Sequence, residues 1–303
     1  MMDILVTGGT GMIGNALRKF VPQAEFLNRS QFHSLGFQIK DRYIIHLAAR
    51  VGGVKNNTDN VADFYIENSI INNKLLDSAC FGKAKKVVSL LSTCVYPDAA
   101  YVAYPLTEEQ LHIGPPHHSN FGYAYAKRML EVQSRAYRQQ FGCNFISVIP
   151  NNLYGPNDNY DLDSGHVIPA LIRKFHEAKS KGAEEVYVWG SGKPVREFTF
   201  ARDAAKIILW LAENYDSAEP VNIGNPECVS IEALSKMIGE EIGYEGRVKF
   251  DASKPDGQYE KPSSNEKLRS LGWTGEYTPL RDGLRETIKS FVDRYPHVRG
   301  VTV

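Results

Sequence analysis

The chain has 303 residues, of which 43% are hydrophobic and 23% are charged, and its 35 basic and 35 acidic side chains give a formal net charge of zero. This length predicts about two domains with an ample core. The balanced charge provides no global basic surface that would collect nucleic acid or an anionic membrane. The first residues lack a signal-peptide pattern and no apolar run reaches membrane-spanning length, so we expect a cytoplasmic protein without nucleic-acid or membrane partners. The four widely spaced cysteines form neither a Cys-x-x-Cys nor a zinc motif, and no metal is expected.

A glycine-rich turn stands near the N-terminus. The apolar residues 4–6 read as a strand, and the turn Gly8-x-x-Gly11-x-x-Gly14 leads into a helical pattern. Glycines at these positions let the backbone approach a pyrophosphate, whose charge is met at the start of the helix. The next strand, residues 25–27, is followed by Arg29 and a serine where an acid would favour NAD. A guanidinium there favours the 2′-phosphate of NADP, although a solvated loop arginine is the alternative.

Strands and helices alternate through the rest of the first half. Residues 43–49, 86–91 and 144–150 are nearly continuous apolar runs, and residues 59–81 show a helical pattern. This alternation predicts an α/β fold with a Rossmann-type, doubly wound parallel sheet. We place an NADP-binding domain at 1–153 and a smaller α/β substrate domain at 154–303, with about 198–224 returning to the first sheet.

Ser92 and Cys94 follow the strand at 86–91, and ligands in such folds bind beyond the carboxyl ends of the strands. If the strand stays extended, their side chains project to the same face and meet the same ligand. Taken alone, a capping serine and a buried cysteine are the simpler interpretations of these two residues.

Tyr123 and Lys127 have the i, i+4 spacing that places two side chains on one face of a helix. A positive neighbour favours the ionised form of a phenol, whose pKa is otherwise near ~10. A phenol tuned in this way suits proton exchange with a carbonyl or alcohol oxygen while a hydride moves at the attached carbon. An ordinary exposed pair on an amphipathic helix is the alternative.

Three residues of the second half are further candidates. His166 stands at the start of a predicted helix, where a capping or surface histidine is also common. Trp189 could stack on a base, and Arg196 could bind a phosphate with two hydrogen bonds.

These motifs together resemble the extended short-chain dehydrogenase/reductase family over essentially the whole chain. The stretches that carry the resemblance include Ser-Thr-Cys-Val-Tyr-Pro at 92–97, Tyr-Ala-Tyr-Ala-Lys at 123–127, Asn-Leu-Tyr-Gly-Pro at 152–156, His-Val-Ile-Pro-Ala-Leu at 166–171 and Ser-Lys-Pro-Asp-Gly at 253–257. Within that family, the combination of the Cys94 motif with His166 is similar to enzymes that convert GDP-4-keto-6-deoxy-D-mannose to GDP-L-fucose with NADPH.

The resemblance implies a role for each matching residue. Ser92, Tyr123 and Lys127 would carry reduction at C4, while Cys94 as base and His166 as acid would invert C3 and C5. The GDP-sugar would be bound by Asn152, Lys174, Trp189, Arg196, Asp256 and Lys261. NADP would be bound by Gly8, Thr10, Gly11, Met12, Ile13, Gly14, Arg29, Ala48, Ala49, Leu91, Tyr123, Lys127, Pro150, Asn152, Leu153 and His166.

Two departures from the family pattern affect individual contacts. Residues 258–261 read Gln-Tyr-Glu-Lys where many members have Thr-x-Arg-Lys, and Thr10 replaces an arginine of some members, which leaves Arg29 as the visible 2′-phosphate ligand. The family also implies a homodimer formed through helices like 60–81 and 121–140. A nucleotide-sugar 4-reductase, a 4-epimerase and a catalytically silent dinucleotide-binding protein remain the alternatives, and the joint presence of Cys94, His166, Tyr123 and Lys127 argues against them.

Overall fold

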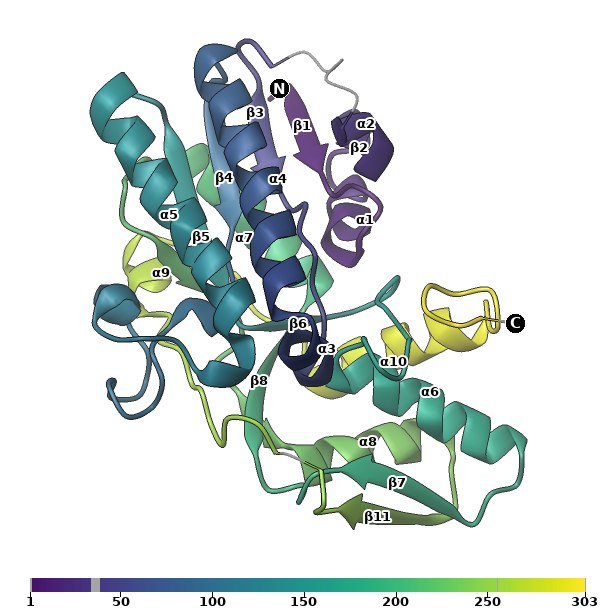
Figure 1. The fold of residues 1–303 in the computed structure, drawn as a ribbon. Helices are drawn as coiled ribbons and strands as arrows, with labels where there is room; N and C mark the ends of the chain where they lie inside the picture. Colours follow the sequence, from purple (N-terminus) through teal and green to yellow (C-terminus); the bar gives the residue numbers. More distant parts are fainter. Residues whose placement is uncertain (1, 34–38, 255, 303) are drawn as a thin grey trace.

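The computed structural model describes residues 2–33, 39–254 and 256–302. Its largest sheet contains six parallel strands, which confirms the predicted doubly wound α/β fold (Figure 1). In spatial order they are β2 (Glu25–Leu27), β1 (Ile4–Thr7), β3 (Tyr43–His46), β4 (Lys86–Leu90), β5 (Phe145–Pro150) and β9 (Val221–Ile223). Because all six strands run in one direction, the turns that follow their carboxyl ends meet at one edge of the sheet.

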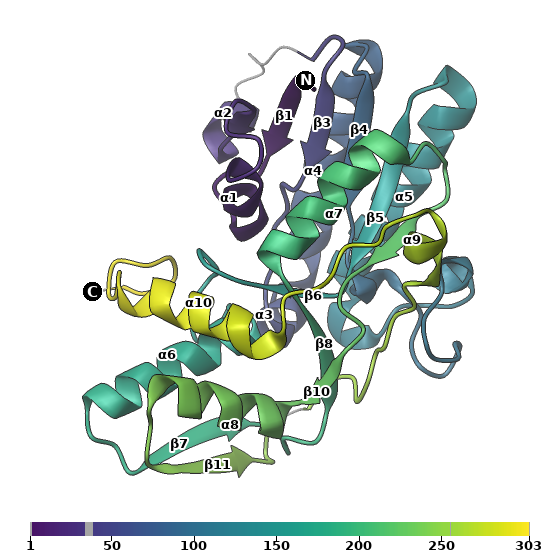
Figure 2. The same cartoon turned by 180° about the vertical axis from the view of Figure 1, so that it is seen from behind.

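Helices cover both faces of this sheet. Figure 1 shows α4 (Val61–Phe81) and α5 (Phe121–Phe141) side by side on one face, and Figure 2 shows α1 (Met12–Arg18) and α7 (Ala201–Asn214) on the other. The short helical segments are α2 (Arg29–His33), α3 (Val54–Asp59), α9 (Glu266–Ser270), η1 (Thr93–Val95), η2 (Glu108–His112) and η3 (His118–Asn120).

A smaller α/β region lies below the carboxyl edge of the six-stranded sheet in Figure 1. It holds a three-stranded and a two-stranded sheet, packed with three helices. Their bounds are β10 (Cys228–Ser230), β8 (Val195–Phe200) and β6 (Asn152–Tyr154) for the first sheet, β11 (Arg247–Asp251) and β7 (Glu185–Trp189) for the second, and α6 (Val167–Ser180), α8 (Ile231–Ile242) and α10 (Leu280–Val292) for the helices. After β8 and α7 the chain returns to the large sheet, where β9 pairs with β5.

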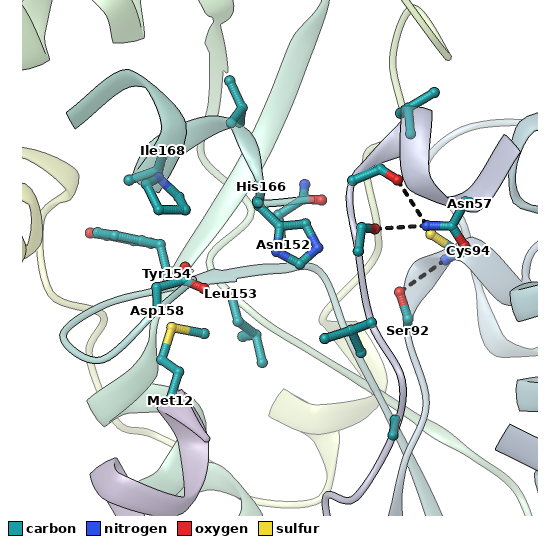
Figure 3. Close-up of a pocket in the computed structure, with 18 of the residues that line it drawn as sticks. Met12, Asn57, Ser92, Cys94, Asn152, Leu153, Tyr154, Asp158, His166 and Ile168 are labelled. Carbon is teal, nitrogen blue, oxygen red and sulfur yellow. Dashed lines mark hydrogen bonds between the residues drawn. The ribbon is translucent and has the colours of Figure 1, made fainter. Parts of the chain in front are cut away.

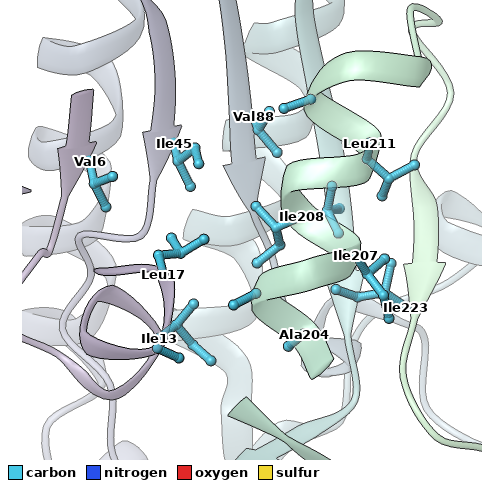
Figure 4. Close-up of a cluster of buried hydrophobic side chains, with 14 of the residues drawn as sticks. Val6, Ile13, Leu17, Ile45, Val88, Ala204, Ile207, Ile208, Leu211 and Ile223 are labelled. Atoms are coloured by element: carbon cyan, nitrogen blue, oxygen red, sulfur yellow. The ribbon is translucent and has the colours of Figure 1, made fainter. Parts of the chain in front are cut away.

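The apolar face of α7 seals the side of the sheet that carries the glycine turn. Ile207, Ile208 and Leu211 recur at helical spacing and pack with Leu17 of α1 and Val88 of β4, all fully or nearly fully buried (Figure 4). Complete burial of one such aliphatic side chain contributes about 1.5–3 kcal/mol. The core therefore fixes α1, and with it the preceding turn, against the ends of the strands.

The elements differ from the prediction at three places. The strand expected at 43–49 ends at His46, because its partner β1 ends at Thr7. The helix expected at 59–81 is divided at Asn60, whose φ of −125° and ψ of 42° are not helical, into α3 and α4. Residues 152–154, which follow the predicted strand at 144–150, form an additional short strand, β6, by pairing with β8. Within the described ranges, no helix combines the length and the apolar character needed to cross a membrane.

Candidate active site

A cavity of about 1050 Å³ lies where the carboxyl edge of the large sheet faces the smaller α/β region. With one exception, every residue predicted to bind cofactor or substrate or to act in catalysis lines this cavity; the exception, Lys127, is buried behind Tyr123. Those on the sheet side are Gly8, Thr10, Gly11, Met12, Ile13, Gly14, Arg29, Ala48, Ala49, Leu91, Ser92, Cys94, Tyr123, Pro150, Asn152 and Leu153, and those opposite are His166, Lys174, Trp189, Arg196, Asp256 and Lys261.

The glycine turn has the shape that a dinucleotide requires. Gly8 has a φ of +70°, and a Cβ atom there would lie 2.8 Å from the backbone nitrogen of Ala48. A Cβ atom on Gly14 would lie 2.7 Å from Gly9, so neither position accepts a larger residue. Gly11 is the N-cap of α1 and lines the cavity. The turn therefore fits the pyrophosphate of a nicotinamide cofactor.

Arg29 belongs to an ion-pair cluster at the rim of the cavity. Its Nη2 atom lies 3.2 Å from Oε2 of Glu67, whose Oε1 lies 2.5 Å from Nη1 of Arg50. Arg29 begins the short helix α2 and its side chain is largely exposed. Arg50 and Glu67 also line the cavity, and the sequence interpretation assigned no role to either. Only the fold brings these charges, from three segments, to one place.

Ser92 and Cys94 reach the same cavity by a different route from the one expected. The chain after β4 does not stay extended; it turns into η1, with Ser92 as its N-cap. The Ser92 hydroxyl oxygen accepts a hydrogen bond from the backbone nitrogen of Cys94 at 3.3 Å (Figure 3). Serine is a favoured N-cap because its oxygen satisfies a backbone N–H that the helix leaves free. The two side chains therefore share the cavity through a turn, and the condition that the strand stays extended through Cys94 is not met.

Lys261 contacts the thiol of Cys94. Its Nζ atom donates a hydrogen bond to Sγ at 3.7 Å, although the two residues are 167 positions apart. A neighbouring ammonium group stabilises a thiolate, which is the basic form of cysteine. Lys261 was predicted as a substrate ligand, and the structure adds this contact with the candidate base.

Tyr123 and Lys127 lie on one face of α5 as predicted, with Nζ of Lys127 6.0 Å from the centre of the Tyr123 ring. The ammonium group donates a hydrogen bond to the carbonyl oxygen of Leu90 at 2.7 Å, and burial lowers the pKa of Lys127 to about 8. Burial raises the pKa of the Tyr123 phenol above its ordinary value, Cys94 raises it further, and a hydrogen bond from Ser92 opposes this. The pKa of Tyr123 is therefore raised, where the sequence analysis expected a positive neighbour to lower it, and desolvation by burial is the largest cause.

A buried polar network ties the glycine turn to α5. His46 makes hydrogen bonds with Oγ1 of Thr7 at 2.8 Å and with Oδ1 of Asn72 at 3.1 Å, and the amide of Asn72 donates to the carbonyl oxygen of Ala126. Burial, reinforced by the charge of Lys127, lowers the pKa of His46 to about 3. The neutral imidazole thus donates through Nε2 and accepts through Nδ1. Sequence patterning did not identify this network.

His166 faces the cavity from the smaller region. It is the N-cap of α6, its side chain makes no capping hydrogen bond, and it lies across the cavity from Ser92 and Cys94 (Figure 3). Asn152 lies near it, and its amide donates to the carbonyl oxygen of Glu197 at 2.8 Å. The neighbouring Asn151 also lines the cavity; it is buried, and its amide donates to the carboxylate of Glu197 at 3.1 Å.

The far end of the cavity carries an aromatic ring and several charges. Trp189 is 42% exposed, and Nζ of Lys174 lies 5.2 Å from the centre of its ring. Arg196 is partly buried and donates to the carbonyl oxygens of Val195 and Tyr259. The carboxylate of Asp256 already accepts hydrogen bonds from the backbone nitrogen and the hydroxyl of Ser191, at 2.6 and 2.7 Å. Pro255, a member of the same sequence motif, lies outside the described residues.

Comparison with known proteins places the chain among nucleotide-sugar enzymes. It is 41% identical to the GDP-L-fucose synthase of Dictyostelium discoideum over 313 residues, which cover 98% of this chain and 97% of that protein. It is 34% identical to the GDP-L-fucose synthase of Escherichia coli (strain K12), with 98% of each chain covered. A crystal structure of a GDP-L-fucose synthetase from Naegleria fowleri bound to NADP matches with a TM-score of 0.89 and 40% identity, over 98% of this chain and 95% of that one.

The match to a family model covers more than half of the chain. Residues 21–224 match the NAD dependent epimerase/dehydratase family. The near-complete coverage of the relatives and the six-stranded parallel sheet agree with this match. The chain belongs to the NAD dependent epimerase/dehydratase family.

Proposed function

We propose that this protein is an NADP-dependent oxidoreductase with epimerase activity, which converts GDP-4-keto-6-deoxy-D-mannose to GDP-L-fucose by inversion at C3 and C5 and reduction at C4. The observation that carries the proposal is the meeting of two sets of groups in one cavity. Ser92 and Tyr123 suit a reduction, and Cys94 and His166 suit proton transfer at carbon. The similarity to GDP-L-fucose synthases supports this choice among the reactions of the family.

The reducing half of the site consists of Tyr123, Ser92 and Lys127. The glycine turn and Arg29 would hold NADPH, which would supply the hydride for C4 of the sugar. Tyr123 donates the proton to the C4 oxygen, and its raised pKa keeps the phenol protonated for that step. Ser92 donates a second hydrogen bond to the same oxygen. The ammonium group of Lys127 lies next to the ring of Tyr123. Arg29 binds the 2′-phosphate, which favours NADPH over NADH.

The epimerising half consists of Cys94 and His166. The 4-keto group acidifies the protons on C3 and C5, so that a thiolate can remove one of them while the electrons move to the C4 oxygen. Lys261 stabilises the thiolate of Cys94 through their contact. His166, on the other side of the cavity, returns a proton to the opposite face of the carbon.

The far end of the cavity binds the GDP portion. Trp189 offers an exposed ring on which a guanine can stack, and Lys174 and Arg196 provide positive charge for the diphosphate. The carboxylate of Asp256 accepts hydrogen bonds from Ser191, so Asp256 supports the binding site by fixing the turn that follows Trp189.

The test is the reaction of the protein with GDP-4-keto-6-deoxy-mannose and NADPH in deuterated water. The proposal expects NADPH oxidation, a product that co-elutes with GDP-L-fucose, and deuterium at both C3 and C5 by mass spectrometry. Oxidation without ring deuterium would identify a plain 4-reductase. Absence of oxidation with this sugar would contradict the proposed substrate.

We also propose a homodimer formed through α4 and α5. Their outward surfaces carry exposed apolar side chains, which a monomer has little reason to expose. These are Tyr65, Ile66, Ile70 and Phe81 of α4 and Phe121, Met129, Val132 and Phe141 of α5. Light scattering should give twice the chain mass, and an Ile70→Arg/Met129→Arg variant should give a monomer. Val292→Arg, at an exposed apolar residue of α10, is the matched control and should remain dimeric. A monomeric wild type would contradict the proposal.

We further propose a cytoplasmic location and a domain division between residues 153 and 154, with about 198–224 returning to the first sheet. The four cysteines in the structure are free thiols, and a catalytic Cys94 must stay reduced, which suits a reducing compartment. The change from the six-stranded sheet to β6 near residue 152 supports the boundary. Expression of residues 1–153 joined to residues 198–224, which supply α7 and β9, would test it: a folded fragment supports the boundary and an unfolded one contradicts it.

A further inference from the structure

Arg50 lines the cavity in the loop after β3, and the proposed reaction gives it no role. Its backbone is held at two points by Asn68, a fully buried residue of α4. The backbone nitrogen of Arg50 donates to Oδ1 of Asn68 at 2.9 Å, and Nδ2 of Asn68 donates to the carbonyl oxygen of Arg50 at 3.0 Å. The guanidinium carbon lies 5.0 Å from the centre of the Phe64 ring, within the range of a cation–π contact. Arg50 is therefore fixed against α4.

The guanidinium of Arg50 forms ion pairs with two carboxylates of α4. Its Nη1 atom lies 2.5 Å from Oε1 of Glu67 and 3.2 Å from Oδ2 of Asp63. The side chains of Arg50 and Glu67 are only 28% and 33% exposed, whereas that of Asp63 is 58% exposed. Salt and water screen a partly buried pair less than an exposed one. Glu67 is therefore the main partner of Arg50.

Glu67 also contacts the arginine that is expected to recognise the cofactor. Its second oxygen, Oε2, lies 3.2 Å from Nη2 of Arg29, so one carboxylate bridges two guanidinium groups. The side chain of Arg29 is 78% exposed, and an ion pair so exposed is weak enough for an anion to replace the carboxylate. An anion that binds Arg29 would lie close to Glu67, whose charge opposes its binding unless another group neutralises it.

Arg50 supplies that neutralising charge. Together Arg29, Arg50 and Glu67 carry two positive charges and one negative charge, and all three residues line the cavity. Without Arg50, the charges of Arg29 and Glu67 would cancel. An acidic residue beside the adenosine ribose ordinarily favours NAD, because it accepts a hydrogen bond from the 2′-hydroxyl and repels a 2′-phosphate. Glu67 is such an acid, contributed here by α4.

We propose that Arg50 is a specificity-determining residue for the cofactor: it favours NADPH over NADH by neutralising Glu67 beside Arg29. This inference rests on the proposed function, which assigns the 2′-phosphate to Arg29. A phosphate monoester carries a charge of about −1.5 to −2 at pH 7, and NADH has none at that position. The contribution of Arg50 is therefore confined to NADPH.

The test measures the dissociation constants of NADPH and NADH from nicotinamide fluorescence, without sugar and at low ionic strength. Arg50→Met keeps an unbranched side chain against Phe64. Its Kd for NADPH should rise about tenfold, while its Kd for NADH should stay within about twofold of wild type. Asp63→Asn is the matched control, because it removes the other carboxylate paired with Arg50 from a position outside the cavity lining. This control should bind both cofactors as wild type does.

A second substitution shows whether Arg50 acts through Glu67. The double variant Arg50→Met/Glu67→Gln should bind NADPH within about twofold of wild type, because the opposing carboxylate is gone. A double variant as weak as Arg50→Met would overturn the inference, since Arg50 would then bind the phosphate itself. Glu67→Gln alone should bind NADPH at least as tightly as wild type, and weaker binding would show that Glu67 supports Arg29 instead of opposing the phosphate.

The same measurement separates the inference from the proposed function. Arg29→Met should weaken the binding of NADPH and leave that of NADH unchanged. If it does so while Arg50→Met loses neither cofactor, or loses both equally, only the inference fails. If Arg29→Met binds NADPH as wild type does, the assignment of the 2′-phosphate fails and the inference fails with it. If every variant binds as expected but wild type does not oxidise NADPH with the sugar, only the proposed reaction fails.

Discussion

The two walls of the cavity differ in how much of their chemistry is already in place. On the wall formed by the large sheet, Lys127 is buried and hydrogen-bonded to Leu90, and the pKa values of Tyr123 and Lys127 are shifted by burial. On the opposite wall, His166 and Trp189 are exposed to the cavity. The first wall is preorganised before any ligand binds, whereas the second offers groups that a ligand must cover.

This difference follows from what holds each wall. Tyr123 and Lys127 stand on a helix of 21 residues packed against α4 and the sheet, and the network of His46 and Asn72 ties that helix to the glycine turn. His166 and Trp189 stand at the ends of their elements, next to loops. Preorganised groups contribute to the transition state, and exposed groups contribute mainly to binding.

The largest expected effect is on the preorganised wall. Tyr123→Phe removes the proton donor to the C4 oxygen, and the rate of NADPH oxidation should fall about 10³-fold. Deuterium exchange at C3 and C5 should stay within about threefold of wild type, because Cys94 and His166 remain. Stopped-flow absorbance and mass spectrometry measure the two rates. A loss of less than tenfold in reduction would show that the phenol is not the donor.

The Lys127→Met variant tests how much the buried ammonium group destabilises the folded protein. Burial lowers the pKa of Lys127 to about 8 from 10.5, so the charged amine destabilises the folded state at neutral pH. After subtraction of the lost hydrogen bond to Leu90, we expect the variant to be more stable by about 2 kcal/mol in urea unfolding at pH 7.

The extra stability of Lys127→Met over wild type should decrease as the pH rises. The destabilisation caused by burying the charged amine of Lys127 is fully present below about pH 8. It decreases as the pH rises towards 10.5, because the folded state then holds the neutral amine. The difference between Lys127→Met and wild type should therefore shrink between pH 8 and 10. A variant that is less stable than wild type at pH 7 would show that Lys127 stabilises the fold instead.

The smallest expected effect is on the exposed wall. Trp189→Ala removes a stacking surface, and the KM for the GDP-sugar should rise about tenfold, equivalent to about 1–2 kcal/mol, with kcat nearly unchanged. Tyr187→Ala is the control, because Tyr187 projects from the same face of β7 and is exposed outside the cavity. Equal effects of the two substitutions on KM, or a loss confined to kcat, would show that Trp189 does not bind the GDP-sugar.

Sequence patterns predicted the parts of the fold that depend on local rules. Apolar runs gave the strands of the parallel sheet, and the spacing of the glycines gave the turn before α1, because both depend on backbone geometry within a few residues. Helical spacing also placed Tyr123 beside Lys127 correctly.

Sequence patterns failed where distant segments decide the outcome. The contact of Lys261 with Cys94 joins residues 167 positions apart, and the ion pairs of Glu67 join α2, α4 and the loop after β3. The sign of the shift in the pKa of Tyr123 depends on burial, which the spacing to Lys127 does not report. Ser92 illustrates a local failure, since a strand and a capped turn are both compatible with its sequence.

The most direct test of the account is Cys94→Ser in deuterated water, with NADPH and GDP-4-keto-6-deoxy-mannose. The two-walled site predicts that the variant still oxidises NADPH through Tyr123, incorporates no deuterium at C3 or C5, and gives a reduced sugar with the configuration of the starting material at those carbons. Deuterium at both carbons at the wild-type rate would contradict the account, because the base for epimerisation would then be a group other than Cys94.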